Sequence, residues 1–92
     1  MGYIFNDDVA KKSYQSGKSR VVHPAGMKKY YEWRRLIRDR GVSPSDSAEK
    51  VGGLYFKRLT GNQYSIRLTQ GHRVLFSING HNVTVLGIGG HY

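Results

Sequence analysis

The sequence has no cysteine, only two prolines and, beyond Glu49, no side-chain carboxylate. The lack of cysteine excludes a disulfide framework and a cysteine-based zinc site, so burial of apolar side chains must hold the fold together. No apolar run approaches the roughly 20 residues of a membrane span. The first residues also lack the basic-then-apolar pattern of a signal peptide. We therefore expect a cytoplasmic protein with no membrane partner.

Positive charge dominates what is present. Fifteen Lys and Arg stand against six Asp and Glu, which gives a formal net charge of +9. Such an excess favours a polyanionic partner, with nucleic acid as the first candidate. The alternatives are a domain that is merely basic, or one neutralised by an acidic partner protein. Because all six acids precede residue 50, any catalytic mechanism in the second half must work without a carboxylate of its own.

A chain of 92 residues has room for one domain with a single core, residues 1–92. In its first half we expect a strand over residues 2–5, a helix over 9–15 capped by the polar residues before it, and a helix from Pro24 closed by Gly41. The polar stretch 42–53 predicts a loop, or a loop with one helical turn.

An apolar stripe on the second helix carries two large aromatic residues, Tyr30 and Trp33. Their spacing of three places them on one helical face, which favours packing against a sheet. A platform on which nucleobases stack is the sharper alternative.

Apolar and polar residues alternate through the second half, which is typical of half-buried strands. Four such segments predict an antiparallel meander: Leu54 to Leu59, Gln63 to Thr69, Arg73 to Ile78 and Asn82 to Ile88.

The Asn79-Gly80 dipeptide is the strongest hairpin signal, because a type I′ turn needs two residues that tolerate positive φ. Placed at the centre of the turn, it predicts apolar pairs on one face, Phe76 with Val83 and Val74 with Val85.

The preceding turn is predicted as a three-residue loop, 70–72, because this register keeps apolar side chains together. Leu68 then lies beside Val74, and Ile66 beside Phe76. The other face carries Arg67, Thr69, Arg73 and Leu75.

Two neighbouring arginines, Arg67 and Arg73, are thus expected on the face away from the helices. Like charges so close destabilise a sheet unless an anion lies between them. Alternatively, the two side chains point apart into water or pair with Asp46 or Glu49.

The segment "YSIRLTQGHRVLFSINGHNVTVLGIGGHY" resembles the C-terminal part of the RelE/ParE toxin superfamily, and most closely its YoeB-like mRNA interferases. The resemblance covers about the last third of the chain. It rests on an aromatic-Ser-x-Arg-x-Thr strand, a His-Arg pair opening the next strand and a terminal His-Tyr: Tyr64, Ser65, Arg67, Thr69, His72, Arg73, His91 and Tyr92.

The resemblance implies a RelE-like α+β fold, with two N-terminal helices on one face of a mainly antiparallel five-stranded sheet. It also implies a cognate antitoxin as protein partner, and cleavage of mRNA in the ribosomal A site without metal or cofactor. In this reaction the 2′-hydroxyl attacks the adjacent phosphorus and leaves a 2′,3′-cyclic phosphate.

By this resemblance Arg73 stabilises the reacting phosphate, His91 is the general acid, and Tyr92 orients the phosphate or stacks on a base. Arginine is suited to the first role because it can hold two phosphate oxygens at once. Three further cations are expected to contact RNA phosphates: Lys57, Arg58 and Arg67.

The general base departs from the YoeB-like pattern, in which a glutamate precedes the second strand. Leu54 occupies that position here. Glu49 in the preceding loop and His72 are the two candidates, and His72 is equally well explained as a structural partner in its turn. A zinc site formed by His72, His81 and His91 would match no usual ligand spacing.

Three other functions stay open. A ParE-like inhibitor of DNA gyrase would share the fold, but those proteins typically lack the terminal His-Tyr. A binding module for nucleic acid without catalysis is the second. The nuclease tip of a larger secreted toxin is the third, against which the Met1 start is expected to count.

Overall fold

The computed structural model of the protein describes residues 2–17 and 21–90. The elements are β1 (Ile4–Asn6), α1 (Asp8–Gln15), α2 (Pro24–Arg40), α3 (Pro44–Val51), β2 (Lys57–Thr60), β3 (Gln63–Thr69), β4 (His72–Asn79) and β5 (Asn82–Gly90). One five-stranded sheet has the strand order β1-β5-β4-β3-β2. Strand β1 is parallel to β5 and the other neighbours are antiparallel. The predicted α+β class is confirmed, with a mixed sheet and a third helix among the described residues.

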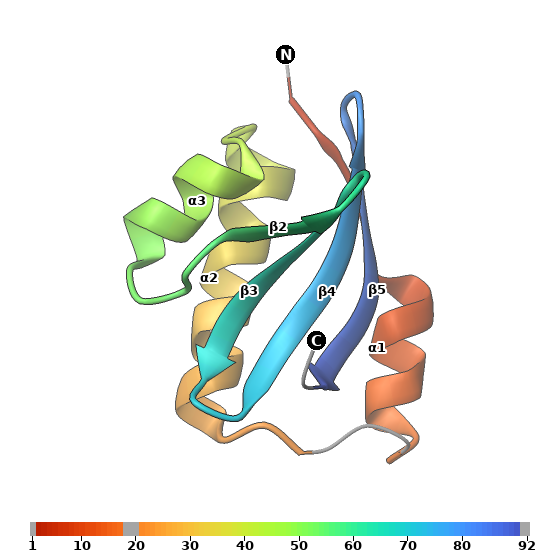
Figure 1. The fold of residues 1–92 in the computed structure, drawn as a ribbon, viewed down its shortest axis with the longest axis vertical. Helices are drawn as coiled ribbons and strands as arrows, with labels where there is room; N and C mark the ends of the chain where they lie inside the picture. The colour runs from red at the N-terminus through yellow and green to blue at the C-terminus, as the bar shows by residue number, and fades with distance from the viewer. Residues whose placement is uncertain (1, 18–20, 91–92) are drawn as a thin grey trace.

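The two faces of the sheet differ in their cover. In Figure 1, α2 lies behind the sheet, α1 lies beside β5 and α3 lies near the β2 edge. The face toward the viewer is left uncovered by the described helices. No helix in the described ranges is long and apolar enough to cross a membrane.

Helix α1 begins at Asp8, one residue before the predicted start, and Asp7 does not cap it with its side chain. Instead Asn6 Oδ1 accepts a hydrogen bond from the Asp8 backbone N–H at 3.0 Å. The Asp7 carboxylate turns inward, where it accepts from the Tyr30 hydroxyl at 2.7 Å and from Arg34 Nε at 3.0 Å. The Asp7 side chain therefore connects the β1–α1 junction to α2 instead of capping α1.

Helix α2 has the predicted limits. Its first residue is Pro24, and His23 caps it by accepting from the Ala25 N–H at 3.2 Å. Gly41 ends it with a left-handed φ of 66°. Tyr30 and Trp33 are fully buried, which confirms that they pack against the sheet and excludes a role as an exposed stacking platform.

The prediction of a loop, or of a loop with one helical turn, over residues 42–53 is wrong. This segment contains the two-turn helix α3. Ser43 caps this helix by accepting from the Asp46 N–H at 3.1 Å, and Pro44 occupies the first helical position. The helix has few apolar residues and packs mainly on α2 rather than on the sheet. A hydrophobic stripe, the signal used for the other helices, is therefore missing.

The first strand of the second half begins later than predicted, at Lys57 rather than Leu54. Leu54 is completely buried, and its carbonyl accepts from the Arg67 N–H. Tyr55 then takes a φ of 50°, which a residue with a side chain rarely adopts. This local reversal explains why residues 54–56 are not part of β2.

The β4–β5 turn is centred on Gly80-His81 rather than on Asn79-Gly80, so the predicted pairs are wrong. Phe76 pairs with Val85, and Ile78 pairs with Val83. Gly80 takes the positive φ of 59° that the first central position requires, and an additional apolar pair is gained. Since the pairing shifts by two residues, the face is unchanged and the four predicted core side chains are buried: Val74, Phe76, Val83 and Val85.

The β3–β4 register is also corrected. Arg67 lies directly opposite Arg73, and Thr69 opposite His72, with a bulge at Leu68 between the two pairs. The bulge turns Thr69 toward the helices, where its methyl carbon lies against Gly26 of α2. Thr69 therefore does not share the arginine face, whereas the neighbouring arginines are confirmed and lie closer than predicted.

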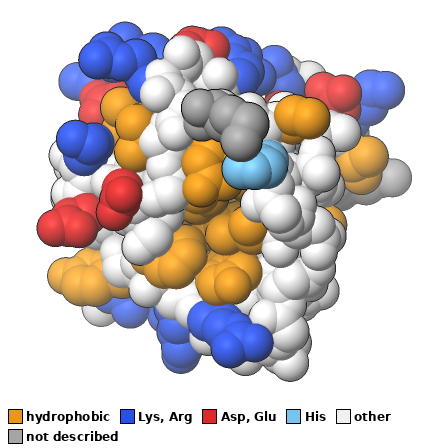
Figure 2. Space-filling view, turned by 90° about the horizontal axis from the view of Figure 1, so that it is seen from above, with side chains coloured by type: hydrophobic (Ala, Val, Ile, Leu, Met, Phe, Trp, Pro, Cys, Tyr) orange, Lys and Arg blue, Asp and Glu red, His pale blue; other side chains and the backbone are white. Residues whose placement is uncertain are grey.

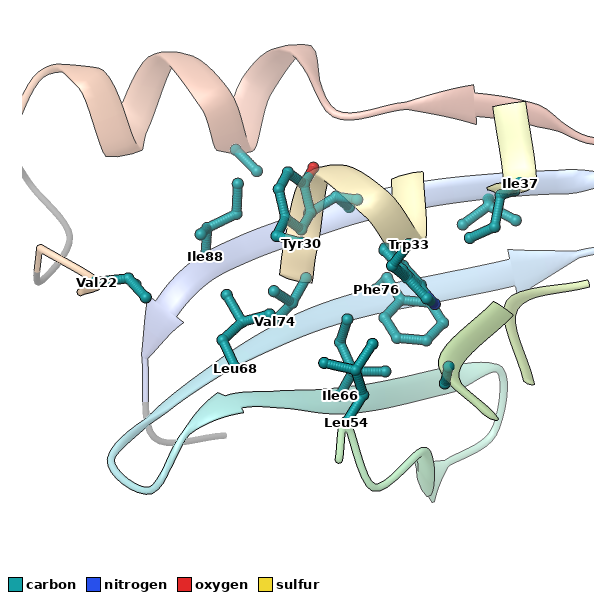
Figure 3. Packing of buried hydrophobic residues seen from close by; sticks show 14 residues of the cluster. Val22, Tyr30, Trp33, Ile37, Leu54, Ile66, Leu68, Val74, Phe76 and Ile88 are labelled. Atoms are coloured by element: carbon teal, nitrogen blue, oxygen red, sulfur yellow. The ribbon is translucent and has the colours of Figure 1, made fainter. Parts of the chain in front are cut away.

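The core lies between the helices and the sheet (Figure 3). Trp33 is at its centre, 4.9 Å from the Phe76 ring, and its indole N–H donates to the Pro44 carbonyl at 3.0 Å. Side chains from β3, β4 and β5 point toward α2 in this view. This packing fixes the opposite face of the same strands, where the charged residues lie.

Candidate functional site

A small cavity on the uncovered face brings together side chains from the segment before β2 and from β2, β3 and β4. Its volume is about 100 Å³, and it is lined by Tyr55, Lys57, Ser65, Arg67 and Arg73. We call it the arginine cavity. Lys57 is the direct partner of Ser65, and Arg67 is the direct partner of Arg73. Alternation along the strands thus places three cations around one hollow.

Arg67 lies in an unusual environment for a guanidinium group. Its Cζ lies 4.8 Å from the centroid of the Tyr55 ring, a cation–π contact. Its Nε is buried and has no hydrogen-bond partner among the described residues. Neither Asp46 nor Glu49 forms an ion pair with it, because the ion pairs between described residues involve only Asp7 and Asp39. A buried donor without an acceptor is costly, and an anion in the cavity would remove this cost.

Arg73 is half-buried and joins the cavity to the end of the last strand. Its partner on β5 is Gly90. The chain bends just before this point, where Gly89 takes a φ of 92°, as expected from the Gly89-Gly90 pair. His91 and Tyr92, the proposed acid and its neighbour, lie outside the described residues.

The structure does not bring the two candidate bases into the arginine cavity. His72 Nδ1 lies 2.8 Å from Thr69 Oγ1. Thr69 is the last residue of β3 and lies against Gly26 of α2. Glu49 is exposed on α3 and lines a different cavity, of about 410 Å³, which borders Tyr55. Tyr55 therefore stands between Glu49 and the arginines.

The three expected phosphate contacts divide in the same way. Lys57 and Arg67 line the arginine cavity. Arg58 is exposed and does not line it, since its Nε donates to the Gly61 carbonyl at 3.0 Å in the β2–β3 turn. Successive residues of a strand point to opposite faces, so Lys57 and Arg58 could not both line this cavity.

Tyr55 and Ser65 complete the cavity although sequence reasoning did not assign them to it. Ser65 was visible as the residue two before Arg67, and this spacing puts both on one face. Tyr55 carried no such signal, because its position depends on the reversal at φ 50° and on the bond between Leu54 and Arg67.

The other buried polar cluster lies on the helix-covered side of the sheet. Asp7 accepts hydrogen bonds from Tyr30 and Arg34, and all of these contacts are internal. Burial, and then the bond to Asp7, raises the pKa of the Tyr30 phenol far above its ordinary value. Tyr30 is therefore a permanent donor, and the cluster is structural.

His81 lies at the β4–β5 turn, exposed, with its ring 5.9 Å from that of Tyr3. Figure 2 looks down on the end of the molecule that holds this turn, where apolar side chains gather in the middle and basic ones lie at the edges. Within residues 2–17 and 21–90, no three His, Asp or Glu side chains lie close enough to hold a metal ion.

Comparisons with protein-family models and with curated protein sequences find no match for this chain. The candidate site therefore rests on its own geometry, and on the short sequence resemblance described above.

Proposed function

We propose that the protein is an endoribonuclease toxin with a RelE-like fold, which cleaves mRNA in the cytoplasm without a metal ion. The observation that carries the proposal is the Arg67–Arg73 pair on the uncovered face, with a buried Arg67 Nε that has no acceptor among the described residues. Two facing guanidinium groups and an adjacent lysine suit the charge of a phosphodiester.

The proposed chemistry uses the RNA's own nucleophile. The 2′-hydroxyl gives its proton to the surrounding water, and its oxygen attacks the adjacent phosphorus. The bond from phosphorus to the 5′-oxygen breaks, and that oxygen takes a proton from His91. Arg67 and Arg73 stabilise the negative charge that develops on the phosphate oxygens. A 2′,3′-cyclic phosphate and a 5′-hydroxyl are the products.

His91 is the proposed general acid for the leaving oxygen. The reference pKa of histidine, near 6.5, makes it able to donate a proton at neutral pH. A peptide bond joins His91 to Gly90, the residue opposite Arg73. Glu49 and His72 both lie outside the arginine cavity, so the proposal assigns the general base to neither.

In the cell, the proposed partners are mRNA, the ribosome that presents it, and a cognate antitoxin that neutralises the toxin. The test begins with induced expression and pulse labelling. We expect methionine incorporation to stop early while DNA synthesis continues. Failure of DNA synthesis with normal methionine incorporation would instead indicate a gyrase inhibitor.

Purified protein gives the chemical test. RNA incubated with it should be cut in the presence of a metal chelator, and the new 3′ ends should carry a cyclic phosphate. His81→Ala is the matched control, because its ring lies at the opposite end of β4 from Arg73 and should not affect cutting. RNA that stays intact both alone and on ribosomes would contradict the proposal.

A further inference from the structure

A second cavity borders the arginine cavity across a single side chain. Its volume is about 410 Å³, and it lies between α3 and the segment 52–56. Tyr55 lines both cavities, with Lys57 and the two arginines on one side and Glu49 on the other. A nucleotide with its phosphate among the arginines has room to place its base beyond the Tyr55 ring, in the second cavity.

Tyr55 has the properties of a stacking surface. The guanidinium of Arg67 covers one part of the ring, 4.8 Å from its centroid, yet Tyr55 is 69% exposed. The backbone beneath it is fixed, because the preceding carbonyl is bonded to the Arg67 N–H of β3. Proteins that recognise single-stranded RNA commonly stack its bases on aromatic rings and guanidinium planes. An exposed, backbone-anchored tyrosine beside a phosphate-sized cationic hollow fits that use.

Among the residues that line this cavity, Glu49 carries the charge, whereas Ser45 and Tyr55 contribute hydroxyl groups. It is exposed on α3, and it forms no ion pair with another described residue although the protein carries +9. Repulsion should disfavour a carboxylate near an RNA-binding surface, unless the carboxylate accepts hydrogen bonds from the ligand. Among the four RNA bases, guanine alone presents two adjacent donors on its Watson–Crick edge, N1–H and N2–H. The two oxygens of a carboxylate match them.

We propose that the cavity between α3 and Tyr55 is a nucleobase subsite selective for guanine, in which the base stacks on Tyr55 and donates to Glu49. This proposal rests on the proposed function, since it assumes that the attached phosphate occupies the arginine cavity. It also gives Glu49 a role in recognition rather than in proton transfer.

The test measures the affinities of the four 3′-mononucleotides and of inorganic phosphate by titration calorimetry. We expect 3′-GMP to bind tightest, because the other bases lack the paired donors. Tyr55→Leu should lower the affinity for 3′-GMP by roughly tenfold or more and should lower that for inorganic phosphate by less, because phosphate gains nothing from stacking. Tyr55→Phe should behave as wild type, because the ring and not the hydroxyl is used.

Glu49→Gln should remove the preference for guanine, since an amide offers one acceptor where the carboxylate offers two. Asp46→Asn is its matched control on the same helix: it changes the charge equally but lies outside this cavity. Tyr31→Leu is the control for Tyr55, as another exposed tyrosine, on α2. Both controls should keep the wild-type order of affinities.

A wild-type circular dichroism spectrum shows that each variant is folded, so a loss of nucleotide affinity larger than the loss of phosphate affinity supports the subsite. Equal affinity for the four nucleotides in the wild type would overturn guanine recognition. A Tyr55→Phe variant as weak as Tyr55→Leu would overturn stacking.

RNA cleavage is read separately, which keeps the two proposals distinguishable. Cleavage without base preference, together with equal affinities for the four nucleotides, would contradict the guanine subsite but would still support the nuclease activity. A guanine preference in binding without any cleavage of RNA, alone or on ribosomes, would contradict the nuclease activity but would still support a nucleotide-binding site.

Discussion

Arg34 and Arg67 lie on opposite sides of the same sheet and differ in the hydrogen bonding of their Nε atoms. Arg34, on the helix-covered side, donates to the Asp7 carboxylate at 3.0 Å, and Asp7 also accepts from Tyr30. Arg67, on the uncovered side, has a buried Nε with no acceptor among the described residues and contacts the Tyr55 ring. The first arginine is neutralised by its own chain, whereas the second is surrounded by further positive charge.

This difference separates an arginine that its own chain pairs from one that, under the proposed function, would bind a phosphate. Folding selects arrangements in which buried charges are paired, because an unpaired one is costly. A protein that keeps the Arg67 Nε buried without an acceptor among the described residues retains a cost of this kind in its unbound state. A phosphate bound in the arginine cavity would remove the cost, which is why the proposed function is placed on the uncovered face.

The largest expected effect is on catalysis at the uncovered face. His91→Ala should slow RNA cleavage about 10²–10⁴-fold, which is the usual range for loss of a general acid. Arg73→Ala should also abolish toxicity, because it removes one of the two guanidinium groups that stabilise the phosphate. Both variants should keep the wild-type circular dichroism spectrum and antitoxin binding. A folded His91→Ala variant that cuts RNA at the wild-type rate would remove His91 from the mechanism.

The next largest effect is on stability at the covered side. Asp7→Ala removes the acceptor shared by Tyr30 and Arg34 and should lower the free energy of unfolding by about 3 kcal/mol. We choose the low end for a buried pair because 21% of the Arg34 side chain is accessible to water. Urea denaturation measures it. A loss below about 1 kcal/mol would equal that of a surface ion pair and would contradict a structural role for the cluster.

Arg67→Gln should show the reverse pattern. The uncharged side chain relieves repulsion with Arg73, so the free energy of unfolding should stay the same or rise slightly. RNA binding should weaken, and its dependence on salt should become shallower, because one fewer counterion is released. Binding curves at several salt concentrations, beside urea denaturation, test both parts. A variant that loses stability and keeps the wild-type salt slope would make Arg67 a structural residue.

The faces of the strands could be predicted from sequence because alternation alone decides them. Ile66, Val74 and Phe76 are buried as expected, and Arg67 with Arg73 occupies the other face. The registers could not be predicted, because alternation does not show where a bulge falls, and the β3–β4 and β4–β5 ladders both contain bulges. A shift by two residues keeps the face, so the site survived an error in pairing.

Helix α3 and the position of Tyr55 were not predicted, for different reasons. Helix α3 could have been predicted from its start alone, because Ser43-Pro44 followed by Asp46 is a recognisable helix N-terminus. The apolar stripe used to predict the second helix does not indicate it. Tyr55 owes its place to a positive φ and to a backbone bond across to β3, which no local pattern specifies. The Tyr55 side of the second cavity therefore depends on tertiary structure.

The smallest expected effect concerns an arginine that belongs to neither face, Arg38, whose exposed side chain donates from Nε to Asp39 at 2.8 Å. This hydrogen bond lowers the pKa of Asp39 below its ordinary value of 3.8. A carboxylate with a lowered folded-state pKa adds stability above its ordinary pKa, and this contribution is lost as the pH falls through the folded-state value. Wild-type protein should therefore lose slightly more stability than Asp39→Asn between neutral pH and a pH well below 3.8. Both partners are exposed, so the difference should be small and should shrink further in high salt.

Urea midpoints of the wild type and Asp39→Asn, with and without salt, measure this difference in stability. An NMR titration of the Asp39 carboxyl measures its pKa directly. An Asp39 that titrates at or above 3.8 would show that this exposed pair does not persist in solution, in contrast to the buried pair of Arg34 with Asp7.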